Sequence, residues 1–143
     1  MKMKTLWLAI FVVAVWLSSY GQETVKTKDV LHTPAKGSAE RQAILDALRG
    51  SEQVTFQVHS LKVHNGWAWV DTTPLDKQGK ATAEGGPNLL HFENGKWTVL
   101  DLSKVPEDPN APLGPEDPSP TYIKNVRKTF PGIPVDILPK AVH

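Results

Sequence analysis

Two Asn-Gly pairs limit what this chain can fold into more than any other feature. The pairs are Asn65-Gly66 and Asn94-Gly95, and apolar and polar residues alternate on both sides of each. Asn and Gly both tolerate the positive φ that a two-residue turn requires, so each pair predicts a tight β-hairpin. The sequence therefore predicts four antiparallel strands, over residues 54–63, 67–73, 89–93 and 96–102.

The first predicted strand has a break in its alternation. Val58 precedes the break, Leu61 and Val63 follow it, and Ser60 stands where an apolar residue is due. A slip of one residue would turn every later side chain to the other face. We therefore predict a β-bulge near His59 and Ser60, which would restore the pattern and bend the strand.

The second predicted strand is apolar on both faces. Trp67 and Trp69 lie on one face, and Ala68 and Val70 on the other. Such a strand is expected to be central or covered on both sides. The connection that follows, residues 74–88, contains three glycines and is predicted to be mobile or lid-like.

An amphipathic helix is predicted over residues 39–48, before the strands. Ser38 can cap its first turn and Gly50 can end it. Its apolar stripe consists of Ala43, Ile44, Leu45, Ala47 and Leu48. We expect this stripe to pack on the sheet. The fold class is thus α+β over residues 37–104, with one N-terminal helix on a curved four-stranded antiparallel meander.

The first 21 residues have the pattern of a signal peptide. A basic start precedes an uncharged apolar run of 13 residues, 5–17, and the small residues Ser19 and Gly21 predict cleavage after Gly21. The run is shorter than the ~20 residues of a spanning helix. An uncleaved membrane anchor is the alternative. The chain has no cysteine, which excludes a lipid-modified cysteine and a disulfide framework.

The next segment, residues 22–36, is polar and predicts a flexible arm, or at most a short strand around residues 29–32. Cleavage would remove two lysines and leave 14 basic against 15 acidic side chains. A chain so near neutrality lacks the basic stripe that nucleic acid requires, so we expect no nucleic-acid partner. We also expect no stable membrane span after cleavage.

Prolines recur at every third position over residues 105–120. They are Pro106, Pro109, Pro112, Pro115 and Pro118. Polyproline II has three residues per turn, so this spacing predicts an extended rod with the prolines along one edge. We interpret the segment as a stiff linker or a strap across the domain. A docking peptide for an aromatic groove is the alternative.

The last segment, residues 121–143, predicts a short helix and an extended apolar tail. Tyr122 and Val126 belong to its apolar side, and Lys124, Arg127 and Lys128 make the helix basic. We expect the helix to dock on the rest of the domain. Contact with an anionic surface is the alternative.

Three stretches, residues 37–49, 54–70 and 89–102, together resemble a family of small exported bacterial proteins of uncharacterised function. The shared features are a Ser-x-Glu-Arg helix start, a Gly-Trp-Ala-aromatic-Val strand and a final Gly-x-Trp strand. The arrangement is similar to cystatin-like and nuclear-transport-factor-2-like domains, in which a curved sheet packs on a helix. The resemblance implies a fold and no catalytic residues.

No sequence motif for catalysis is present, neither a Gly-x-Ser-x-Gly elbow nor a His-Glu-x-x-His, Walker or Gly-x-Gly-x-x-Gly pattern. His59, His64 and His91 are the candidates for acid–base or metal chemistry. If His59 and His91 converged with Asp71, a three-ligand metal site would form. The alternative is three histidines in turns or facing solvent. We predict no catalytic residue, no metal and no cofactor.

Candidates for a ligand pocket are residues that a cone-shaped domain would place inside or at its open end: Arg41, Trp67, Trp69, His91 and Trp97. An arginine at the open end would hold a carboxylate. The run Gly85-Gly86-Pro87 is either the hinge of a flap over this pocket or a flexible turn.

The sequence thus predicts an exported, periplasmic or secreted, domain that binds a small ligand or a protein of the cell envelope without catalysis. Two alternatives stay open. One is a small pocket enzyme that uses a buried carboxylate or histidine, and the other is an interaction protein that acts through its Pro-rich tail.

Overall fold

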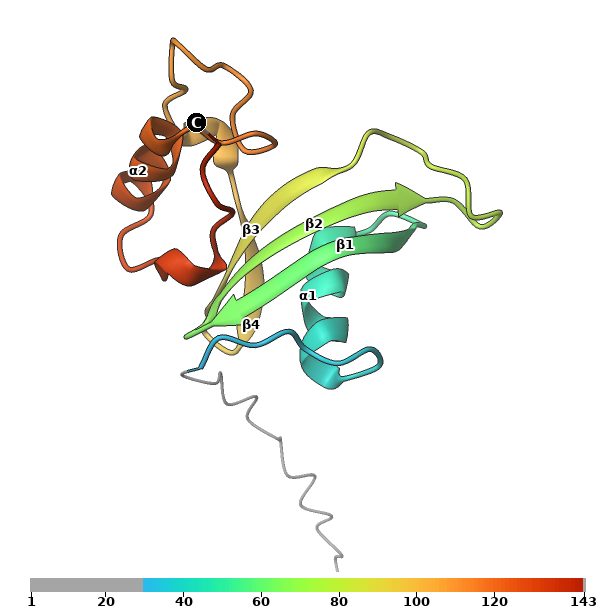
Figure 1. Cartoon of the computed structure of the whole chain (residues 1–143). Coiled ribbons are helices and arrows are strands. Elements are labelled where there is room, and N and C mark those ends of the chain that lie inside the picture. The colour runs from blue at the N-terminus through green and yellow to red at the C-terminus, as the bar shows by residue number, and fades with distance from the viewer. Residues whose placement is uncertain (1–29, 143) are drawn as a thin grey trace, which may run out of the picture.

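The computed structural model describes residues 30–142, so the predicted signal peptide and residues 22–29 lie outside the described part (Figure 1). The chain forms an α+β domain of the predicted class. Its elements are α1 (Ala39–Arg49), β1 (Thr55–His64), β2 (Trp67–Leu75), β3 (Gly86–Glu93), β4 (Lys96–Leu100), the 3-10 turns η1 (Leu102–Lys104) and η2 (Val135–Ile137), and α2 (Pro120–Thr129).

Helix α1 begins and ends where its caps predict. The Oγ of Ser38 accepts a 3.3 Å hydrogen bond from the amide of Arg41. Gly50 has a φ of 54° and donates its amide to the carbonyl of Asp46. Ile44 from the apolar stripe is completely buried, so the helix is held by its packing on the sheet.

The sheet is an antiparallel meander in the order β1-β2-β3-β4. Both Asn-Gly turns are confirmed, with a positive φ at Asn65 (47°), Gly66 (77°), Asn94 (51°) and Gly95 (78°). Strands β2 and β3 are longer than predicted, because Pro74, Leu75 and residues 86–88 continue the pairing. The connection between them is therefore shorter than predicted.

The β-bulge in β1 is confirmed. Val58 pairs with Thr72 and Ser60 pairs with Asp71, so His59 is the extra residue. The bulge keeps Val58, before it, and Leu61, after it, on the face that packs against α1.

Both faces of β2 are covered, as predicted. Ala68 and Val70 are completely buried in the cluster that includes Ile44 of α1. Trp67 and Trp69 belong to a second cluster, formed with the C-terminal segment. In Figure 1, α1 and α2 lie apart from each other, each next to the sheet. The domain therefore has three layers, with the sheet in the middle.

The prediction of an extended polyproline II rod is wrong. Residues 109–116 form successive turns, and Asp108 and Ala111 pair in an isolated bridge. The Oδ1 of Asp108 accepts from the amide of Asn110 at 3.0 Å, and Gly114 adopts a φ of 56°. Proline has nearly the same φ in a turn and in polyproline II, so the Asp, Asn and Gly residues between the prolines decide the conformation.

The C-terminal segment packs on the sheet, as predicted for its helix. The Oγ of Ser119 caps α2 by accepting from the amide of Tyr122 at 3.1 Å. Further along, both Oδ atoms of Asp136 lie 2.9 Å from Nδ1 of His64 at the end of β1. The amide of Val142 donates to the carbonyl of Pro118 at 3.0 Å and closes the segment on itself. A packed segment of this kind counts against a tail that acts as a free docking peptide.

The first described residues lie along the outer edge of β1. His32 and Val63 exchange two backbone hydrogen bonds of 2.9 and 2.8 Å, which form an isolated β-bridge and not a strand. The Nε2 of His32 also lies 2.8 Å from Oε2 of Glu40 in α1. Among the described residues, no helix has the length and apolarity needed to cross a membrane.

Candidate functional site

The five predicted pocket residues do not line one pocket. Trp67 and Trp69 are 8% and 4% exposed and pack against the C-terminal segment. Trp97 is 5% exposed and packs on the opposite face, among the residues that contact α1. Both faces of the sheet are filled by the chain's own side chains, so the expected hollow is occupied.

One pair of the five is stacked ring on ring. The rings of Trp67 and His91 are stacked, with centroids 3.9 Å apart. The Nδ1 of His91 also lies 2.9 Å from Oε1 of Glu93. Arg41 is separate from this pair, and its Nη1 donates to the carbonyl of Pro34 at 3.2 Å. These contacts stabilise the fold and do not enclose a ligand.

The histidines do not assemble into the conditional metal site. His59 bonds to Thr73, with Nε2 2.8 Å from Oγ1, whereas His64 contacts Asp136 and His91 contacts Glu93. Within residues 30–142, no three His, Asp or Glu side chains are grouped so that they could hold a metal ion.

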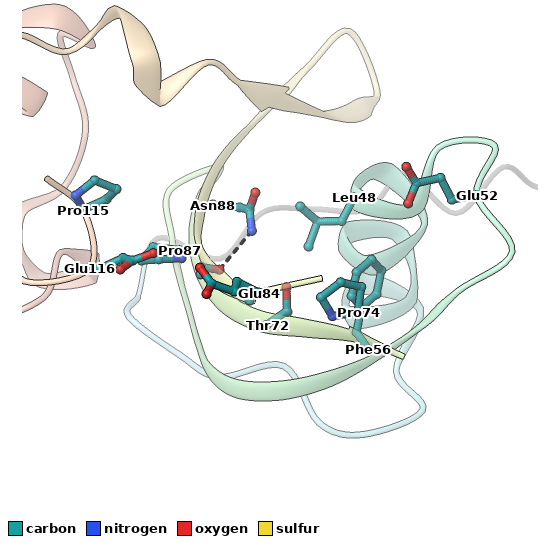
Figure 2. A pocket seen from close by; sticks show the side chains of 12 residues that line it. Leu48, Glu52, Phe56, Thr72, Pro74, Glu84, Pro87, Asn88, Pro115 and Glu116 are labelled. Atoms are coloured by element: carbon teal, nitrogen blue, oxygen red, sulfur yellow. Dashed lines mark hydrogen bonds between the residues drawn. The ribbon is translucent and has the colours of Figure 1, made fainter. Parts of the chain in front are cut away.

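A groove lies at the far end of the sheet from the Asn-Gly turns, where β2 leads into β3 (Figure 2). Its volume is about 370 Å³, and it is open to solvent. One wall comes from the end of α1 and from β1, and the other from the Pro-rich segment. The lining residues are Leu48, Glu52, Phe56, Thr72, Pro74, Glu84, Gly85, Gly86, Pro87, Asn88, Pro115 and Glu116.

A second hollow of about 520 Å³ shares residues 84–87 and Glu116 with the first. It adds His59 and Asp71 beside the β-bulge. Carboxylates thus border both hollows, and among residues 30–142 neither Lys nor Arg lines them. Because like charges gather here without a counter-charge, the groove favours positively charged groups.

At Gly85, which lines the groove, the backbone passes very close to Thr72 and Thr73 of β2. A Cβ at this position would lie 2.4 Å from the carbonyl oxygen of Thr72 and 2.5 Å from Oγ1 of Thr73, so only glycine fits. A Cβ on Gly86 would be 3.6 Å from Oε1 of Glu116, which places that carboxylate directly over the strand. Glu116 and Pro115 therefore bring the Pro-rich segment to the sheet, as Figure 2 shows.

Sequence reasoning missed Glu84 and Glu116 as groove residues. It singled out Gly85-Gly86-Pro87 next to a pocket, and the structure places these residues in the lining of the groove. The acidic residue before this run was a usable signal. Glu116 was not foreseeable, because its position depends on the turns that replace the predicted rod.

Comparison with known proteins provides no relative for this chain: no family model, curated protein or solved structure matches it. The site must therefore be interpreted from its own chemistry. It offers carboxylates, one histidine, the apolar surfaces of Leu48 and Phe56, and the backbone at Gly85 and Gly86. This set suits the binding of a cationic group on a short apolar stem.

Proposed function

We propose that this protein is an exported, non-catalytic binding module of the cell envelope, and that its ligand is a cationic group bound in the groove beside Gly85. One observation carries the proposal. The two faces of the sheet are filled from within, while the groove is open and bordered by Glu52, Glu84 and Glu116. A basic side chain of a protein or a small amine has the complementary charge.

The pocket enzyme has less support. It requires at least two titratable groups that converge in one enclosed pocket. His59 and Asp71 do line the second hollow, but His59 is exposed and bonds to Thr73. The resemblance to cystatin-like and nuclear-transport-factor-2-like proteins is compatible with either function, since fold does not determine function.

Binding is tested by titrating ¹⁵N-labelled protein, residues 22–143, with a hexalysine peptide and following the amides of Gly85 and Gly86. We expect both resonances to shift. In a Glu84→Gln/Glu116→Gln variant the affinity for the peptide should fall about tenfold or more, since each charged contact contributes about 1 kcal/mol. The matched control is Glu107→Gln/Asp117→Asn. It also removes two exposed charges, both from the Pro-rich segment and both outside the two hollows.

Equal loss in both variants would mean that net charge alone attracts the peptide, and the proposed site would be wrong. Unchanged Gly85 and Gly86 resonances in the wild-type protein would have the same consequence.

Export is tested separately by expressing the whole chain in a bacterium and sequencing the N-terminus of the mature protein. We expect it to begin at Gln22. Retention of residues 1–21 would contradict cleavage and favour the N-terminal anchor.

A further inference from the structure

The outer side of α2 is basic. Lys124, Arg127 and Lys128 are three and four positions apart, which places them on one side of the helix. All three are exposed, and none takes part in an ion pair with the carboxylates of residues 30–142. Three neighbouring cations with no ion-pair partner among the described residues form a surface of positive potential.

The apolar side of α2 is already used. Tyr122 and Val126 are 2% and 0% exposed and belong to the cluster that contains Trp67 and Trp69. The helix therefore cannot turn this side toward a partner without breaking the domain. Any contact that the outer side makes is electrostatic and does not involve insertion of the helix.

Charge is divided unevenly along the described chain. Residues 119–142 carry four basic side chains and one acidic side chain, whereas residues 30–118 carry eight basic and twelve acidic. The one acidic residue of the last segment, Asp136, is paired with His64. The domain thus has a positive side at α2 and a negative groove. An anionic surface would orient the domain so that α2 faces that surface.

We infer that this basic face of α2, meaning Lys124, Arg127 and Lys128, docks on the anionic phospholipid surface of a membrane. Charge complementarity selects this occupant. The three side chains line none of the hollows described, whereas the hot spots of protein interfaces concentrate in well-packed pockets with aromatic or arginine anchors. A headgroup layer attracts exposed lysine and arginine side chains through charge, and the predicted signal peptide would bring the chain through a membrane whose surface it could then meet.

Vesicle sedimentation of residues 22–143 tests this inference, and it does not depend on the groove. Each cation near an anionic leaflet strengthens partitioning about fivefold, so the three together give roughly a hundredfold. We expect binding to vesicles of 70% phosphatidylcholine and 30% phosphatidylglycerol at low salt. We also expect no binding to pure phosphatidylcholine, and release at about 0.5 M NaCl because salt screens exposed charges.

The decisive variant is Lys124→Gln/Arg127→Gln/Lys128→Gln, which should lose about a hundredfold in partitioning. Its control, Lys77→Gln/Lys80→Gln/Lys96→Gln, removes three exposed charges elsewhere and should retain binding. Should the first variant unfold, Lys124→Arg/Lys128→Arg keeps the charge and should bind like wild type, while Arg127→Gln alone should lose about fivefold.

Three results would overturn the inference. They are equal losses in the two triple variants, binding to neutral vesicles, and competition by millimolar inorganic phosphate, which would indicate a discrete anion site. Failure of hexalysine to bind the groove would leave the vesicle result unchanged, so the two proposals can fail independently.

Discussion

The hydroxyl of Ser119 donates a 2.7 Å hydrogen bond to Oδ2 of Asp108 and also accepts from the amide of Tyr122 at 3.1 Å. Both side chains are buried, at 8% and 7% exposure. The same hydroxyl therefore caps α2 and fixes the Pro-rich segment to it. This pair joins two parts of the layer that covers Trp67 and Trp69.

Replacing Ser119 by alanine removes both hydrogen bonds. We expect Ser119→Ala to lower the free energy of unfolding by about 1–3 kcal/mol, which combines the loss of a helix cap with a buried acceptor left without its donor. Urea denaturation measures the change. Ser103→Ala is the control, because Ser103 donates to Asp101 in an exposed turn and should change stability by less than about 1 kcal/mol. Equal effects would show that the Ser119 network is not special.

The pH dependence of stability should report on Asp108. The hydrogen bond from Ser119 and then the amide of Asn110 lower the pKa of Asp108 below its ordinary value, while burial opposes them. Because the folded pKa is lowered, the stabilisation is present above the unfolded pKa of about 4 and is lost as the pH falls through the folded pKa.

The stability difference between wild type and Asp108→Asn should therefore be largest near about pH 6 and shrink as the pH falls below about 4. Urea midpoints over this range measure it. A difference that does not vary with pH would show that the charge of Asp108 contributes nothing.

Tyr122 offers a test at high pH. Its hydroxyl is buried and has no hydrogen-bond partner among the described residues. Burial, followed by the nearby charge of Glu107, raises the pKa of Tyr122. Stability that depends on the neutral phenol is present below the unfolded pKa of about 10 and is lost as the pH rises through the folded pKa.

We expect Tyr122→Phe to be within about 1 kcal/mol of wild type at pH 7, because no hydrogen bond is lost, and to escape this alkaline loss. The chain has two tyrosines, and Tyr20 lies in the predicted signal peptide, so tyrosinate absorbance of residues 22–143 reports Tyr122 alone. Titration at the pKa of free tyrosine would contradict the buried position.

The close approach at Gly85 predicts a specific sensitivity to substitution. The Cβ of Gly85→Ala would meet Thr72 and Thr73 and push the start of β3 away from β2, at a cost of about 1–3 kcal/mol. Gly79→Ala is the matched control, since Gly79 has a φ of 78° and no atom within 4 Å of the added Cβ. That variant should cost about 1 kcal/mol through φ alone. Thermal denaturation compares the two, and a Gly85→Ala variant no less stable than Gly79→Ala would contradict the predicted clash.

Local signals were sufficient to predict the framework of the fold. Asn65-Gly66 and Asn94-Gly95 fix the two hairpins, and the alternation around Ser60 reveals the bulge, because both depend on neighbouring residues alone. The turns over residues 109–116 were missed because proline restricts φ alike in a turn and in a rod.

The candidate site was harder to predict, because it depends on register between distant segments. Trp67 pairs with His91, and Phe92 pairs with Trp97, which places Trp67 and Trp97 on opposite faces. A two-residue turn sets the second of these registers. The first depends on the long connection between β2 and β3, whose pairing was underestimated, so the face of each tryptophan did not follow from the sequence.

The order of the layers along the chain has a consequence for synthesis. The sheet is complete at Leu100, but the segment that covers Trp67 and Trp69 is synthesised after it. Until this segment is made, Trp67 and Trp69 are exposed to solvent, and exposed apolar surfaces of this kind promote aggregation. A chain that ended before α2 would therefore be aggregation-prone and dependent on chaperones, and would not fold as a smaller version of the same domain.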